Sequence, residues 1–182
     1  LIGLTATPNI IEKSYKIWGV PINQLNPEVL VNYKAKNLIC ITIEQLPKLF
    51  INGIITGKSL IMCYSVKKCF KLSEQIPNSF ALISKSNKDY RYVTMNQIRD
   101  YIVQHNSLPE FINVNGQNQK LDVLICTSTL REGINLDECS GIKNVICCIP
   151  DELHITQFVG RCRFNIENLY VVKEKIPKCK WT

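Results

Sequence analysis

Six short apolar runs recur along the chain, separated by stretches of mixed polarity. Within each run nearly every residue is apolar, instead of every second one, and this is typical of parallel strands that are covered on both faces. The expected strands are Leu38–Ile43, Leu60–Tyr64, Phe80–Ile83, Leu121–Cys126, Asn144–Ile149 and Leu169–Val172.

Four of the intervening stretches place apolar residues three and four positions apart, which is the period of an amphipathic helix. The expected helices are Gln45–Ile51, Lys67–Ile76, Met95–Gln104 and His154–Arg163. Strands that alternate with helices predict an α/β fold in three layers, with a mostly parallel central sheet flanked by helices.

The beginning of the chain does not follow this alternation. Leu1–Leu4 has the composition of a strand, and Thr5-Ala6-Thr7-Pro8 turns away from its end. Residues 19–36 carry two prolines and several asparagines, as linkers do. We therefore expect residues 1–18 to be the tail of a preceding domain, residues 19–36 to be a linker and residues 37–182 to be a second domain.

The composition of the chain excludes only a few classes of protein. The formal net charge of +7 favours a polyanionic partner, although a solvated basic surface explains it equally well. Most of the nine cysteines lie inside apolar runs and are expected to be small buried hydrophobes. No pair has the spacing of a zinc ribbon, so no structural metal is expected. The odd cysteine count and the absence of a signal peptide indicate an intracellular setting, in the cytoplasm, the nucleus or a virion.

Two polar segments carry candidate chemistry. Thr127-Ser128-Thr129 follows an expected strand, and ligands of open parallel sheets bind beyond the carboxyl ends of strands. Three hydroxyl groups at a helix start can seat a phosphate, or they can simply cap the helix. Gly133 further along allows a close backbone approach, or a turn.

The second segment is Gln157–Arg163, which is expected to lie on a helix. Paired guanidinium groups stabilise the charge that develops on a transferring phosphoryl group, so Arg161 and Arg163 suit a triphosphate site. A solvated basic helix end is the alternative interpretation. We expect both guanidinium groups to lie at the same carboxyl-end rim as Thr127 and to face a cleft that another lobe closes.

Taken in order, the segments resemble the closing motifs of superfamily 2 helicases. Thr5-Ala6-Thr7 resembles motif III, Gly57–Val66 resembles motif IV, Cys126–Leu136 resembles motif V and Gln157–Arg163 resembles motif VI. The Q-x-x-G-R-x-R form of the last segment is similar to that of viral origin-binding helicases. Phe164 and Arg163 stand where many members have arginine and glycine, and Asn135 stands where aspartate is more frequent.

The resemblance implies the C-terminal RecA-like motor domain of an ATP-dependent helicase or translocase, inactive alone. It implies that ATP is the cofactor and that a missing first domain holds Mg²⁺. It also implies a nucleic-acid partner, with DNA favoured over RNA, and a role in DNA replication or repair. By the same resemblance, nucleic acid contacts Ser65, Thr127, Ser128, Thr129 and Arg131. It also implies that the nucleotide contacts Gly133, Asn135, Gln157, Arg161 and Arg163, and that the last three are catalytic. The residues implied to link the nucleotide to the nucleic-acid path are Thr5, Ala6 and Thr7.

Two alternatives remain from the sequence. One is a degenerate RecA-like module that binds nucleic acid or scaffolds partners without ATPase activity. The other is a free-standing NTPase built on Lys58, because Gly53–Ser59 resembles a phosphate-binding loop. That loop is one residue short and precedes a strand. Asp151–His154 imitates a DExH box but follows the motif III segment instead of preceding it, and Asp137-Glu138 fails the same test of order.

Overall fold

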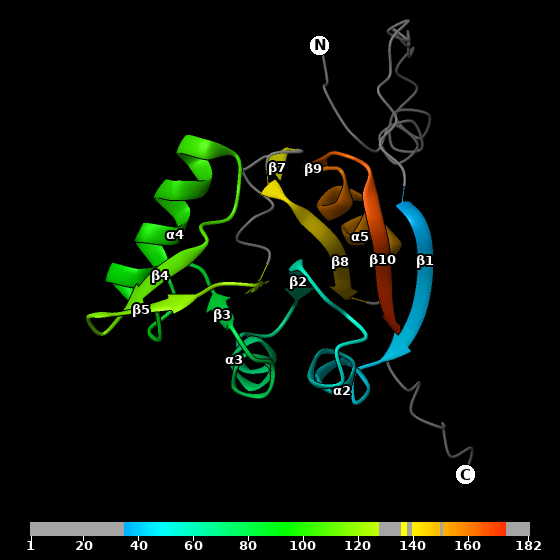
Figure 1. Ribbon diagram of the computed structural model, residues 1–182, viewed down its shortest axis with the longest axis horizontal. Coiled ribbons are helices and arrows are strands. Elements are labelled where there is room, and N and C mark those ends of the chain that lie inside the picture. Colours follow the sequence, from blue (N-terminus) through cyan, green and yellow to red (C-terminus); the bar gives the residue numbers. More distant parts are fainter. Residues whose placement is uncertain (1–34, 128–135, 138–139, 150, 174–182) are drawn as a thin grey trace, which may run out of the picture.

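A single parallel sheet organises the protein, whose computed structural model describes residues 35–127, 136–137, 140–149 and 151–173. The strand order is β1-β10-β8-β2-β6-β3, and every neighbouring pair is parallel (Figure 1). The six strands are β1 (Ala35–Thr42), β2 (Lys58–Cys63), β3 (Ser79–Leu82), β6 (Val123–Cys126), β8 (Ile142–Cys148) and β10 (Ile166–Lys173).

Each of the six apolar runs forms a strand of this sheet, so the predicted α/β fold with a mostly parallel sheet is confirmed. All four residues of β6 are buried, and so is every residue of β2 except Lys58. Strands that bury both faces favour apolar side chains at nearly every position, which explains why these runs lack alternation.

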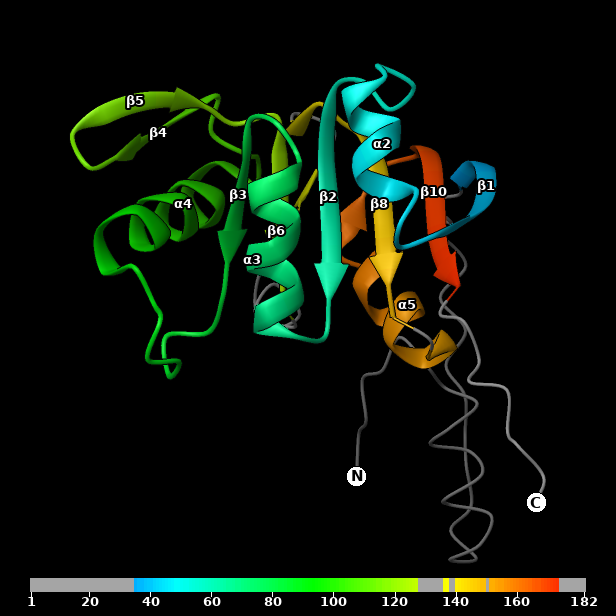
Figure 2. The ribbon, with the colours of Figure 1, turned by 90° about the horizontal axis from the view of Figure 1, so that it is seen from below.

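Helices cover both faces of the sheet. One buried cluster joins alternate strand residues such as Ile61 to α2 (Leu46–Ile51) and α3 (Val66–Gln75). A second cluster joins the intervening residues, such as Leu60, to α4 (Tyr92–His105) and α5 (Glu152–Val159). Figure 2 shows α2 and α3 side by side on one face. The three predicted layers are therefore present.

The helix expected over His154–Arg163 is shorter than predicted, because α5 ends at Val159. Arg161 donates its backbone N–H to Phe158 O at 3.0 Å in a tight turn, and Cys162–Arg163 then forms the short strand β9. Strand β9 pairs in parallel with β7 (Leu136–Asp137). Gly160 is a poor helix former, and the pairing with β7 stabilises an extended backbone beyond it.

A hairpin that the apolar pattern did not predict lies beside α4 (Figure 1). Strands β4 (Phe111–Val114) and β5 (Gln117–Lys120) are antiparallel. Their turn is Asn115-Gly116, with φ of 52° and 85°, the left-handed pair that a tight hairpin requires. The hydroxyl of Thr94 on α4 donates to Asn113 O at 2.7 Å and ties the hairpin to the helix.

Candidate functional site

The two segments that resemble motifs V and VI meet in the β7–β9 ladder. Leu136 lies opposite Cys162 and Asp137 lies opposite Arg163, and the backbone N–H of Leu136 donates to Arg161 O at 2.9 Å. Leu136 and Cys162 are 2% and 1% exposed, so their side chains anchor the ladder in the core. The neighbouring arginines project from this anchored backbone, with Arg161 half-buried and Arg163 exposed.

The position of the ladder corrects the expected geometry of the arginines. Arg163 precedes the first residue of β10 by three positions and so lies at the amino end of that strand, whereas Thr127 follows the carboxyl end of β6. The expectation that the arginines share a rim with Thr127 is therefore wrong. The helix α5 leaves the carboxyl end of β8 and returns to the amino end of β10, so residues that follow it lie at the opposite edge of the sheet.

Asp137 adds a carboxylate next to these arginines. Its backbone N–H donates to Asn106 O, at the C-cap of α4, at 3.1 Å. Its Oδ1 atom is buried and has no hydrogen-bond partner among the residues that the structure describes. A buried carboxylate oxygen without a donor is costly, so a donor supplied from outside these residues would stabilise it. Sequence reasoning missed Asp137, although it directly follows the segment that resembles motif V.

Gln157 lies on α5, one residue before Phe158, which is 1% exposed and anchors the helix in the core. The Gln157 side chain is half-buried and makes no hydrogen bond within the described part of the chain. Its amide is therefore held near the arginine segment by the helix and is available to a ligand.

At the carboxyl-end rim, two predicted nucleic-acid contacts have structural roles. Ser65 is the N-cap of α3, and its hydroxyl accepts the backbone N–H of Lys68 at 3.5 Å, a long and weak contact. Thr127 is 7% exposed, and its N–H donates to Leu82 O at 3.3 Å, which extends the β3–β6 ladder. Ser65 therefore caps α3, a role that the sequence analysis did not consider, and Thr127 is largely closed to solvent.

Tyr64 forms a polar cluster at the same rim. Its hydroxyl lies 2.5 Å from Nδ1 of His154, and the two rings are edge to face with centroids 5.3 Å apart. The Asp151 carboxylate contacts the same Nδ1 atom. The Tyr64 side chain remains 48% exposed, so the cluster presents a fixed aromatic ring of the kind on which nucleic-acid bases stack.

Lys58 does not form a phosphate site. Its ammonium group donates to Leu108 O at 3.1 Å, and the loop before it leads into β2 instead of opening a helix. The segment Gly53–Ser59 therefore lacks the strand-to-helix context of a phosphate-binding loop.

The remaining predicted site residues lie outside the described residues; they are Thr5, Ala6, Thr7, Ser128, Thr129, Arg131, Gly133 and Asn135. Within the described ranges, no group of three or more His, Cys, Asp or Glu side chains is placed to hold a metal ion. Nor does any helix there have the length and apolar character needed to cross a membrane.

Within the described ranges every cysteine except the exposed Cys40 is buried, as the apolar surroundings of most of them predicted. Hydrogen bonds from Cys148 and Cys69, together with the charge of Lys68, lower the pKa of Cys63 to about 4, against the opposing effect of burial. In the ladder, burial raises the pKa of Cys162 to about 12, so this thiol beside the arginines stays protonated at neutral pH.

No family model and no curated protein matches the sequence. Among solved structures, S. cerevisiae Dbp5 bound to RNA and ADP BeF3 is 19% identical, with a TM-score of 0.54 over 92% of this chain and 43% of that one. Mycobacterium smegmatis helicase Lhr bound to ssDNA and AMP-PNP is 14% identical, with a TM-score of 0.52 over 85% and 21%. The E. coli DEAD-box protein SrmB is 12% identical, with a TM-score of 0.50 over 78% of each chain.

The chain thus spans less than half of the matched Dbp5 and Lhr chains, and its identity to all three proteins is low. What these proteins share with it is the arrangement of a parallel sheet between helices. The structural comparisons show that the chain has a RecA-like α/β fold.

Proposed function

We propose that this domain is the second motor domain of an ATP-dependent superfamily 2 helicase or translocase. The observation that carries the proposal is the β7–β9 ladder, in which the segments resembling motifs V and VI pair residue by residue. In a domain with the RecA-like fold, this pairing holds Arg161, Arg163 and Asp137 together on one anchored piece of backbone.

The residues at the ladder fit a nucleotide. Two guanidinium groups offer planar, bidentate donors for phosphate oxygens, and the half-buried carboxylate of Asp137 can accept a hydrogen bond from a hydroxyl group. Bound ATP would supply phosphoryl transfer to water as the energy source. Arg161 and Arg163 would stabilise the charge on the transferring group, and Gln157 would contact the nucleotide or orient water.

Another domain must complete such a site. In the proposal it supplies the phosphate-binding lysine and the carboxylate that holds Mg²⁺, while this domain brings its arginines across the cleft. Closure on ATP and opening after hydrolysis would change the grip on nucleic acid stepwise. The 182-residue chain alone is accordingly expected to show no appreciable ATP hydrolysis.

Nucleic acid is the proposed second ligand. Tyr64 and the exposed end of α3 near Ser65 offer a stacking ring and backbone donors at the carboxyl-end rim. The matched Dbp5 structure contains RNA and the Lhr structure contains ssDNA, so the comparisons do not support the initial preference for DNA. They likewise give no support to a viral origin-binding type or to a role in replication or repair.

The test is nucleic-acid-stimulated ATP hydrolysis by the protein as its gene encodes it, with Arg161→Ala and Arg163→Ala introduced singly and together. The double variant should lose about 10³–10⁵-fold in turnover, because the charge on the transferring phosphoryl group loses its stabilising donors. Both RNA and DNA oligonucleotides should be used as activators. Lys143→Ala, at an exposed position of β8, is a matched control that should change turnover less than about twofold.

Circular dichroism and thermal unfolding should show that the variants remain folded. A folded double variant with undiminished stimulated turnover would contradict the proposal, since the arginines would then have no catalytic part. Absence of nucleotide binding in the unaltered protein, with nucleic-acid binding retained, would instead favour a RecA-like module without ATPase activity.

A further inference from the structure

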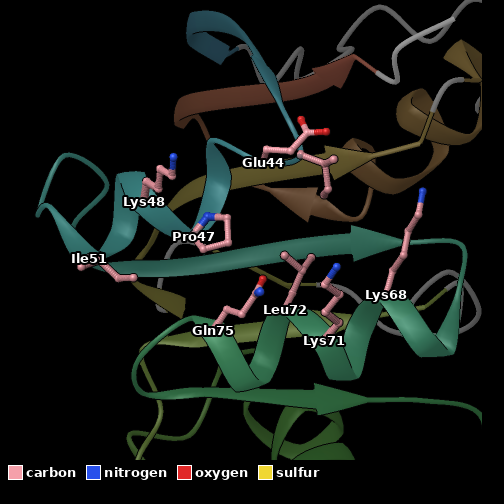
Figure 3. A pocket seen from close by; sticks show the side chains of 9 residues that line it. Glu44, Pro47, Lys48, Ile51, Lys68, Lys71, Leu72 and Gln75 are labelled. Atoms are coloured by element: carbon pink, nitrogen blue, oxygen red, sulfur yellow. The ribbon is translucent and has the colours of Figure 1, made fainter.

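An open groove of about 580 Å³ lies between α2 and α3, above β2 (Figure 3). Apolar side chains form much of its lining, from Ile43 and Pro47 on the α2 side to Leu72 on α3. Ile51, at the end of α2, also lines it and is 64% exposed. Its exposed side chain adds an accessible apolar contact to the half-buried Ile43 and Pro47.

Lysines from both helices border this apolar surface. Lys48 comes from α2, and Lys68 and Lys71 come from α3, where Gln75 continues the same row (Figure 3). Lys48 and Lys71 make no ion pair or hydrogen bond within the described residues. Of the residues that line the groove, only Glu44 is acidic. The groove therefore combines an apolar floor with an excess of positive charge.

The charge of the chain argues against binding of its own terminal segments, or of a second copy of the chain, in the groove. Residues 1–34 carry three lysines against two glutamates, and residues 174–182 carry three lysines against one glutamate. A second copy of the chain brings a net charge of +7. Each of these occupants would add positive charge to a border that is already positive, so the complementary occupant is a different, acidic molecule.

The apolar lining of the groove distinguishes between the two classes of acidic molecule, nucleic acids and acidic peptides. A nucleic-acid backbone is uniformly charged and buries little apolar surface on aliphatic side chains, whereas a peptide can place apolar side chains between its carboxylates. The row from Lys68 to Gln75 spans seven positions of α3, which corresponds to about 10 Å. Two turns of a helix, or three to four extended residues, would match this length.

We propose that the α2–α3 groove is a docking site for an acidic peptide segment of a partner protein, with apolar side chains seated on Ile51 and Pro47 and carboxylates paired with Lys48 and Lys71. The groove lies on the sheet face opposite to α5, in the cluster of buried residues that α2 and α3 share. A partner bound there leaves the β7–β9 ladder uncovered, so docking is compatible with the proposed motor function and does not depend on it.

The experiment selects peptides from a random 12-residue display library on the 182-residue chain and measures their dissociation constants by fluorescence anisotropy. Selected peptides should be enriched in Asp and Glu together with apolar residues. Lys48→Glu with Lys71→Glu should weaken their binding at least about tenfold, and added salt should weaken binding to the unaltered chain. Ile51→Ser, which changes an exposed side chain, should weaken binding about fivefold without unfolding the domain.

The matched control is Lys36→Glu with Lys85→Glu, which changes the net charge equally at exposed positions of β1 and of the loop after β3. It should leave the dissociation constants within about twofold. Equal weakening by the control pair, or selected peptides without acidic enrichment, would overturn the proposal. Displacement of the peptides by a 12-nucleotide single strand, whose own binding the groove pair abolishes, would also overturn it by assigning the groove to nucleic acid.

Discussion

The two faces of the sheet carry positive charge in different ways. On the α4–α5 face, Arg161 and Arg163 extend from a backbone that Leu136 and Cys162 anchor in the core, next to the carboxylate of Asp137. On the α2–α3 face, lysines stand on two helices above an apolar floor. Guanidinium groups on fixed backbone suit the planar recognition of phosphate, whereas flexible ammonium groups act as point charges that can reach the carboxylates of a peptide. One sheet therefore presents two surfaces with different ligand chemistry.

The largest expected effect comes from truncating the core on each face. Phe158→Ala on α5 should lower the free energy of unfolding by about 3–5 kcal/mol, and Leu72→Ala on α3 by about 2–5 kcal/mol, because both side chains are almost fully buried. Urea unfolding measures both values.

Hydrogen exchange at the Leu136 amide, which donates to Arg161 O, separates the two faces. Phe158→Ala should speed exchange there beyond the global change in stability, since it loosens the helix that leads into β9. Leu72→Ala should change this amide only in line with global stability. Equal local effects of the two substitutions would mean that the faces are not independent.

A smaller effect should appear at alkaline pH. Burial raises the pKa of Cys162 to about 12, above its ordinary value of 9.0. Between these values the unfolded chain releases a proton that the folded chain retains, so stability falls as pH rises from about 9 to 12. At pH 10.5 the loss from this thiol should be about 2 kcal/mol relative to pH 8.

Cys162→Ala should make the decline in stability between pH 8 and 10.5 correspondingly smaller, as measured by urea unfolding at several pH values. Cys40→Ala, which removes an exposed thiol from β1, is the matched control and should leave the decline unchanged. An unchanged pH dependence in Cys162→Ala would show that this thiol is not buried as the ladder requires.

The smallest effect concerns the carboxyl-end rim. Tyr64→Phe removes the hydroxyl that contacts His154 but keeps the exposed ring. It should cost about 1 kcal/mol of stability and leave binding of single-stranded nucleic acid within about twofold. Tyr64→Ala should weaken that binding about tenfold, because a stacked base loses its platform. Equal binding by the two variants would remove Tyr64 from the proposed nucleic-acid surface.

The apolar runs predicted the sheet well because a strand that is buried on both faces is apolar at nearly every position. Every predicted strand is present, since a run such as Val123–Cys126 has no polar position to confuse the pattern. The β4–β5 hairpin escaped prediction because Gln117–Lys120 is fully exposed and polar. Its Asn115-Gly116 turn was the available signal.

The site was predicted less well, for a topological reason. The pattern placed Arg161 and Arg163 on a helix, but it contained no information that Leu136 would pair with Cys162 and end that helix at Val159. A two-residue ladder between segments 26 positions apart has no periodicity of its own. Asp137 was discarded for the order of its motif, and only the fold shows that it lies beside the arginines.

The central claim is that the ladder arginines complete an ATP site, and a structure of the gene-encoded protein with Mg²⁺, ADP and beryllium fluoride tests it most directly. Beryllium fluoride stands in for the γ-phosphoryl group. The account predicts a guanidinium nitrogen of Arg161 or Arg163 within about 3.2 Å of that group. Bound nucleotide with both guanidinium groups remote from its phosphates would contradict the account.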